Sequence, residues 1–154
     1  MIETALHEAR TVEVLIEVPR GSFVKRDARG RLEFLSPLPC PFNYGSVPSL
    51  PAADGDALDV VILGPRLMAG QRLNTSVRAL VRFIDDGEQD HKLICSAAPL
   101  SVTEQGLVLG FFHFYALCKR LMNYARGRFG LTRCLGWGDT IDALGTPTSA
   151  GYTR

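Results

Sequence analysis

The order of apolar and polar residues predicts a chain built mainly from β-strands. Residues 11–18 alternate in polarity and end at Pro19, which has no backbone N–H to continue a strand. The run at residues 60–63 is apolar, mostly β-branched and uninterrupted, which indicates a strand buried on both faces. Residues 72–83 predict one or two more strands, and residues 93–97 another. The core of the 72–83 segment is expected to contain Val77, Leu80, Val81 and Phe83.

The two predicted helices lie in the last third of the chain. Residues 106–124 are apolar on most faces and predict a largely buried helix. Ser101 followed by Glu104 forms a capping-box pattern just before it. Tyr115 and Lys119 are four residues apart and therefore share one side of that helix. A short helix capped by Asp139 is expected to follow.

The length of 154 residues fits one domain with a sizeable core. That single domain is expected to span residues 1–154, with loose tails at 1–10 and 146–154. Residues 36–51 are rich in proline and glycine and cannot be regular structure throughout. They place Tyr44 in a loop stiffened by prolines, where its phenol either faces a ligand or packs against the core.

Composition argues against several classes of partner. The formal net charge is +1, so no strong field gathers nucleic acid or an anionic membrane. The four cysteines are far apart, which predicts buried free thiols in a reducing cytoplasm rather than zinc ligands or disulfides. The longest apolar stretch, residues 107–118, includes His113 and is too short to span a bilayer. We expect a soluble cytoplasmic protein without a signal peptide.

An acidic segment opens the apolar strand at residue 60. Asp54, Asp56 and Asp59 are gathered around Gly55, which permits a tight turn. Carboxylates held this closely repel one another unless a hard cation such as Mg²⁺ lies between them. A solvated hairpin turn fits the same residues. An EF-hand loop fits poorly because a strand follows, and an aspartyl-phosphate phosphatase fits poorly because its acids end a strand.

Other polar residues are ambiguous when taken singly. Residues 85–92 form a second acidic segment, which on its own reads as a solvated hairpin loop. Glu17 lies within the apolar part of the first strand, where a solvated strand edge would also explain it. Lys25 alone reads as a surface lysine.

The order and spacing of these segments are more specific. The chain resembles the soluble, family I inorganic pyrophosphatases from residue 12 to about residue 139. The family's Asp-x-Asp-x-x-Asp signature and the apolar strand after it are matched at residues 54–60. The other matching elements are the acidic strand end at Glu17 with Lys25, the Pro-x-x-Tyr-Gly element at Pro41, Tyr44 and Gly45, the Asp85, Asp90 and Lys92 spacing, and the late tyrosine Tyr115.

The resemblance implies an α+β, mainly β fold: a small closed OB-like β-barrel with one long and one short helix packed outside. It also implies Mg²⁺, a cytoplasmic location and a homo-oligomer, commonly a homohexamer in bacteria. The implied reaction is hydrolysis of pyrophosphate by direct in-line attack of a metal-bridged hydroxide. The implied metal ligands are Asp54, Asp59, Asp85, Asp90 and Glu17, with Asp56 as the catalytic base. The implied substrate-binding residues are Lys25, Tyr44, Lys92 and Tyr115.

Two phosphate-binding cations of the family pattern are missing. The family's arginine between Gly30 and Pro41 is missing: alignment from Pro41 puts Leu32 at its position, and alignment from Gly30 deletes the position. Ala116 stands where a lysine follows the late tyrosine. Lys119, one helical turn beyond Tyr115, is the best candidate to replace that lysine. Three functions remain open: a pyrophosphatase, a metal-dependent phosphohydrolase for another phosphoanhydride, and a non-catalytic phosphate-binding barrel. Retention of Asp56 favours an enzyme, because a binding protein has no use for a base.

Overall fold

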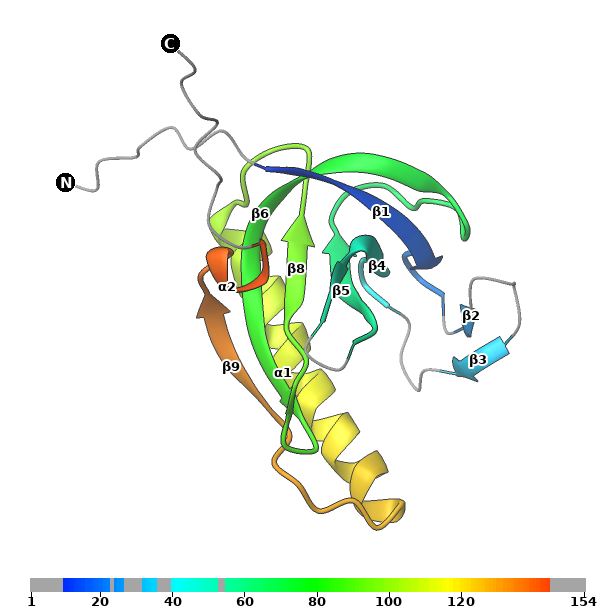
Figure 1. Ribbon diagram of the computed structural model, residues 1–154, viewed down its shortest axis with the longest axis vertical. Helices are drawn as coiled ribbons and strands as arrows, with labels where there is room; N and C mark the ends of the chain where they lie inside the picture. The colour runs from blue at the N-terminus through cyan, green and yellow to red at the C-terminus, as the bar shows by residue number, and fades with distance from the viewer. Residues whose placement is uncertain (1–9, 23, 27–31, 36–39, 53–54, 145–154) are drawn as a thin grey trace, which may run out of the picture.

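Five of the described strands close into a barrel in the computed structural model, which describes residues 10–22, 24–26, 32–35, 40–52 and 55–144 (Figure 1). The strands follow the order β1 (Thr11–Val18), β4 (Asn43–Pro51), β5 (Ala57–Ile62), β8 (Lys92–Cys95) and β6 (Arg72–Asp85). β6 then returns to pair with β1 and closes the barrel. β5 and β8 are parallel, and the other barrel pairs are antiparallel. The predicted closed, OB-like barrel is confirmed.

The remaining described elements lie outside this ring. β7 (Glu88–Gln89) and β9 (Arg133–Gly138) both pair with β6, and β2 (Val24–Arg26) pairs with β3 (Leu32–Leu35) in a separate hairpin. Residues 27–31 between these two strands lie outside the described residues, as do the predicted tail at 146–154 and all but the last residue of the predicted tail at 1–10. The two helices are α1 (Val102–Ala125) and α2 (Ile141–Leu144).

An inner core fills the barrel with alternate residues of its strands. Because successive side chains of a strand point to opposite faces, Val14 and Ile16 of β1 and Val60 and Ile62 of β5 meet inside. Ala143 and Leu144 of α2 pack against this core. The predicted core residues Val77 and Leu80 belong to it. The cysteines are free thiols: Cys95 and Cys134 are buried, and Cys40 and Cys118 are half-buried.

An outer core forms where α1 covers the outside of the barrel. Phe112 of α1 packs with Val61 of β5, Phe83 of β6 and Ile94 of β8, and in Figure 1 the helix lies behind β6 and β8. Val60 and Val61 are therefore buried on opposite faces of the same strand, as the uninterrupted apolar run predicts. The predicted core residues Val81 and Phe83 lie in this outer layer.

The prediction of a largely buried helix is wrong. The capping box at Ser101 and Glu104 is present and α1 runs for 24 residues, but the barrel covers only one side of it. The buried residues of α1 are Val108, Phe112, Ala116 and Asn123, whereas Leu107 and Leu121 are exposed. Among the described residues, neither helix combines the length and the apolar character that crossing a lipid bilayer requires.

Tyr44 lies in a strand, so its predicted position in a loop is also wrong. Glycine and proline reduce local strand propensity in this segment, but β4 pairs with β1 on one side and β5 on the other. Those two ladders supply the hydrogen bonds that hold it extended. Pro48 falls where the β4–β5 register is irregular, between Val47 and Pro51, so its missing donor is tolerated there.

Gly45 provides a test of how closely β1 and β4 approach. A Cβ atom at this position would overlap the carbonyl oxygen of Leu15 and lie 2.9 Å from its carbonyl carbon and 3.2 Å from Cα of Ile16. These are backbone atoms that cannot move aside independently. Gly45→Ala is expected to lower the free energy of unfolding by about 1–3 kcal/mol, the usual cost of overpacking, measured by urea denaturation.

Gly106→Ala is the matched control. A Cβ atom there meets nothing within 4 Å, and alanine is favoured over glycine inside a helix by roughly 1 kcal/mol. This variant is expected to be at least as stable as the parent chain. Equal effects of the two substitutions would contradict the close approach of β1 and β4.

Candidate active site

The candidate site lies on the outer face of the barrel, beside the outer core. Asp59 shares a face of β5 with the outward-facing Val61, and Lys92 shares a face of β8 with Ile94. The two strands are parallel, and Asp59 pairs in register with Lys92. The acidic signature and the second charged segment therefore meet side by side, although they are far apart in sequence.

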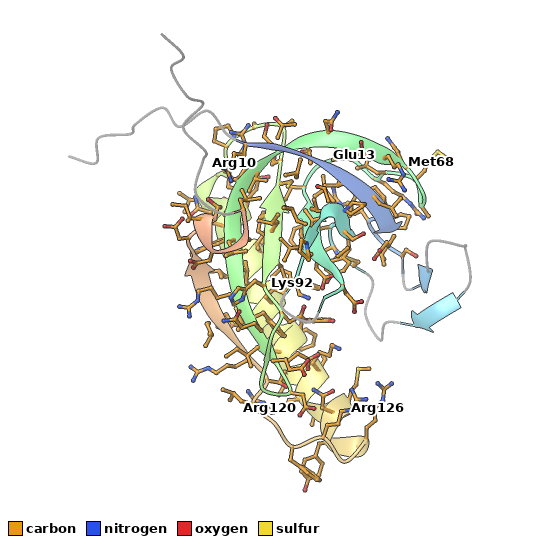
Figure 2. The ribbon with its side chains drawn as sticks, viewed as in Figure 1. Arg10, Glu13, Met68, Lys92, Arg120 and Arg126 are labelled. Atoms are coloured by element: carbon orange, nitrogen blue, oxygen red, sulfur yellow. The ribbon has the colours of Figure 1, made fainter. Side chains whose placement is uncertain are left out.

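Lys92, labelled near the middle of the molecule in Figure 2, contacts both carboxylates of this group. Its Nζ lies 2.5 Å from Oδ2 of Asp59 and 2.8 Å from Oδ1 of Asp90, and the residue is 1% exposed. Burial alone would lower the pKa of Lys92, but the carboxylates of Asp59 and Asp90 help to raise it well above its usual value. The ammonium therefore stays charged, and two of its three donors are directed at the carboxylates.

Aromatic rings enclose the ammonium. Nζ of Lys92 lies 5.8 Å from the ring centroids of both Tyr44 and Phe83, within the range of a cation–π contact. Burial raises the pKa of Tyr44 well above its usual value, although Lys92 opposes this. The phenol thus remains a hydrogen-bond donor at neutral pH. Tyr115 packs on Phe83 at 5.7 Å between ring centroids.

Asp59 and Asp90 form a crowded pair of carboxylates. Burial raises the pKa of Asp90, and Asp59 raises it further, against the lowering effect of Lys92. A second positive charge beside this pair would thus be favourable, and carboxylate oxygens are the ligands that a hard divalent cation prefers. Within the described part of the chain, no three histidine, cysteine or acidic side chains are grouped closely enough to hold a metal. Asp54, another of the implied metal ligands, lies outside the described residues.

A second polar cluster surrounds Asp85 at the end of β6. Its Oδ2 lies 3.2 Å from Nζ of Lys119, and its Oδ1 accepts a hydrogen bond from Nδ2 of Asn123 at 2.8 Å. Oγ1 of Thr132 is 3.5 Å from the same Oδ1. Burial alone would raise the pKa of Asp85, but the Asn123 hydrogen bond and Lys119 lower it overall, so the carboxylate is held ionised.

The other predicted site residues lie at the edges of these clusters. Oγ of Ser46 donates to Oε1 of Glu17 at 3.1 Å, across the irregular part of the β1–β4 pairing. Asp56 is exposed at the start of β5, next to Gly55, whose φ of 86° forms the expected turn. Lys25 lies in β2, and only its backbone is described.

The structure therefore brings Asp59, Asp90, Lys92, Tyr44 and Tyr115 together. It groups Asp85 with Lys119 in the second cluster, which also lies within electrostatic reach of Lys92. Ala116, at the position of the missing lysine, is 4% exposed and packs in the outer core. Lys119, about one turn further along α1, is paired with Asp85, and its role as a replacement for that lysine stays a prediction.

Three residues of these clusters were not predicted to belong to a site. Asn123 follows Tyr115 and Lys119 at intervals of four residues, and that spacing could have revealed it. Phe83 was predicted only as core, because nothing in the sequence shows that a lysine faces its ring. Thr132 reaches Asp85 from the segment before β9, and no local pattern points to it.

The sequence is similar to those of known proteins. The model of the family described as inorganic pyrophosphatase matches residues 14–105. The inorganic pyrophosphatase of Neisseria meningitidis serogroup B is 31% identical over 153 residues, covering 86% of this chain and 82% of that protein. The inorganic pyrophosphatase of Haemophilus influenzae is 34% identical over 99 residues, covering 59% of this chain and 56% of that protein.

The fold comparison points the same way. The crystal structure of inorganic pyrophosphatase from Thermus thermophilus superposes with a TM-score of 0.71 at 27% identity, covering 87% of this chain and 85% of that one. The matched segment 14–105 includes Glu17, Tyr44, Asp59, Asp90 and Lys92. On this evidence the chain belongs to the inorganic pyrophosphatase family.

Proposed function

We propose that this chain hydrolyses inorganic pyrophosphate to two orthophosphate ions in the cytoplasm. The observation that supports this most is the group of Lys92, Asp59 and Asp90, which lies inside the segment that matches the family. Pyrophosphate is highly anionic, and its hydrolysis requires fixed positive charge and aligned donors around the phosphate oxygens. The buried ammonium and the carboxylates beside it are suited to that task.

Family membership implies a divalent metal, and we assign Mg²⁺. The oxygen donors of Asp59 and Asp90 fit a hard cation. Asp54 would complete the set with them, and Glu17 would add a carboxylate at its edge. Bound Mg²⁺ would neutralise phosphate charge and lower the pKa of a water molecule in the site.

The chain's own residues have separate tasks in this proposal. Lys92 fixes the orientation of Asp59 and Asp90 and keeps a third N–H for a phosphate oxygen. The protonated phenol of Tyr44 donates to the substrate, with Tyr115 and Lys25 as further donors. Asp56 accepts the proton of the attacking water. Attack is direct and in line, without a covalent enzyme intermediate.

The first test is a phosphate-release assay over pyrophosphate, tripolyphosphate and nucleotides. Release from pyrophosphate is expected to require Mg²⁺, to stop in EDTA and to be suppressed by Ca²⁺, which lacks the strict octahedral preference of Mg²⁺. Turnover that continues unchanged in EDTA would contradict a metal-dependent reaction. Faster turnover of another phosphoanhydride would reassign the substrate, and binding without any turnover would indicate a phosphate-binding barrel.

A second test distinguishes the proposed base, Asp56, from a proposed metal ligand, Asp59. Asp56→Asn is expected to lower kcat by about 10²-fold or more, the usual scale for loss of a general base, with little change in Mg²⁺ affinity by calorimetry. Asp59→Asn keeps the shape of the Lys92 partner but removes its charge, and it should weaken Mg²⁺ binding directly. Similar loss of Mg²⁺ affinity in both variants would remove the role assigned to Asp56.

We also infer that the chain is a homo-oligomer and that a second copy covers the exposed side of α1. Leu107 and Leu121 are 60% and 65% exposed, which is unusual for leucines on one helix face. The residues on the exposed side, called here the outer stripe, recur at intervals of three and four positions, the spacing found where two helices pack together. The outer stripe consists of Leu107, Gly110, Phe114, Leu117, Leu121 and Tyr124.

Charge and size both favour an antiparallel copy. A two-fold axis near residue 115 would place Leu121 of one chain against Gly110 of the other, where the space beyond Cα is open. Glu104 in the first turn of α1 would then face the far end of the second helix, where Arg126 and Arg128 lie. This contact by itself makes a dimer, and a hexamer would need a second interface.

Leu121→Glu is expected to dissociate this assembly because it puts a charge in the middle of an apolar contact, with the mass measured by sedimentation velocity. Met68→Glu is the matched control: Met68 is also apolar, is 76% exposed, and lies at the opposite end of the molecule from Arg126 (Figure 2). A wild-type mass of one chain, or no effect of Leu121→Glu, would contradict the pairing.

A further inference from the structure

The carboxylate of Asp85 has protein partners on both of its oxygens. Nζ of Lys119 lies 3.2 Å from Oδ2. Nδ2 of Asn123 donates to Oδ1 at 2.8 Å. The contacts of Lys92 with Asp59 and Asp90 each involve one carboxylate oxygen, whereas Lys119 and Asn123 together contact both oxygens of Asp85. A metal ion that bound Asp85 would therefore have to compete with the Lys119 ammonium at Oδ2.

The support behind these contacts is buried. Asn123 and Thr132 are 4% and 1% exposed, and Nδ2 of Asn123 also donates to Oγ1 of Thr132 at 3.2 Å. The same Oγ1 accepts the backbone N–H of Asp86 at 2.9 Å. These contacts fix the orientation of the Asp85 carboxylate from β6, from α1 and from the segment before β9. Lys119 then closes the more open side, with its side chain 28% exposed.

The position of Lys119 on α1 explains how it reaches this carboxylate. Tyr115, Lys119 and Asn123 lie at intervals of four residues and form one row along the helix. Tyr115 packs against Phe83, which is two residues before Asp85 and therefore on the same face of β6. The packing of the first residue in the row thus brings the other two to Asp85.

We propose that the Lys119 ammonium takes the place of a divalent cation at Asp85. The chain would then bind one metal ion fewer around its substrate than it would if Asp85 were a metal ligand. The proposal rests on the proposed phosphohydrolase function and concerns the cation content of that same site. It gives Lys119 a different role from a replacement for the lysine missing at Ala116. Instead of a hydrated ion, the chain supplies an ammonium attached to α1. Asn123 and Thr132 fix the orientation of the carboxylate that pairs with it.

The test counts metal ions rather than turnover. Mn²⁺ bound per chain is measured by electron paramagnetic resonance in the presence of methylenediphosphonate, a pyrophosphate analogue whose bridge does not hydrolyse. Lys119→Met keeps the apolar stem and removes the charge, and it is expected to bind one additional Mn²⁺ per chain. Adding Asp85→Asn to this variant should abolish the additional ion. Lys119→Arg should behave as the parent chain.

Arg72→Met controls for the general effect on Mn²⁺ binding of removing a cation from an ion pair. Arg72 pairs with Glu13 at 3.2 Å on the surface, with both side chains more than half exposed, and no additional Mn²⁺ is expected there. The same number of ions in Lys119→Met and the parent chain overturns the proposal, whether or not the analogue binds. An additional ion in Lys119→Met, together with no release of phosphate from pyrophosphate by the parent chain, would leave the cation replacement intact and contradict the pyrophosphatase activity.

Discussion

The burial of the Lys92 ammonium is the constraint on which the rest of the site depends. A charge with 1% exposure is tolerated only with close counter-charges, so Asp59 and Asp90 must both be within contact distance. That requirement fixes β5 and β8 as neighbours in register, and it directs both carboxylates to the outer face of the barrel. Removing one partner of such a buried pair typically costs about 3–5 kcal/mol. The residues that carry the chemistry therefore also hold these strands together.

Helix α1 has different tasks on its two sides. The inward side closes the outer core through Phe112 and then continues through Lys119 and Asn123 to Asp85. The outward side carries the exposed outer stripe. An altered register of the helix would displace both sides at once, because a helix rotates as a unit. Assembly through the outer stripe would thus bias the position of the Asp85 cluster without touching it.

Local patterns predicted the elements well, because strand alternation and the capping box depend on neighbouring residues. The buried strand at Val60, the core at Phe83 and the helix start at Ser101 were all predicted in this way. The helix environment was not, since hydrophobicity alone cannot distinguish a face that packs on the barrel from one that is exposed. Tyr44 was placed in a loop because proline and glycine obscure a strand that is stabilised by pairing on both sides.

The contacts within the site were less predictable from the sequence than the strands and helices. Spacing grouped Asp85, Asp90 and Lys92, but it could not show that Lys92 pairs with Asp59 and Asp90 while Asp85 pairs with Lys119. The Asp59–Lys92 pair is set by the pairing of β5 with β8, and the Asp85–Lys119 pair by the position of α1 beside β6; both contacts cross long stretches of sequence. The contact of Thr132 with Asp85 spans 47 positions, and no short-range rule predicts such a pair.

The 14-residue strand β6 also determines when the site can form. It pairs with β1, β7, β8 and β9, so it joins the first described strand of the chain to the last. During synthesis, the earlier strands can form the β1–β4–β5 ladder, but β8 must emerge before Lys92 reaches Asp59. The partners of Asp85 emerge later still, on α1 and at Thr132. Contacts of such long range slow folding. A nascent chain would therefore expose the acidic face of β5 until β8 has left the ribosome, and Asp85 would acquire its partners only when α1 and Thr132 have followed.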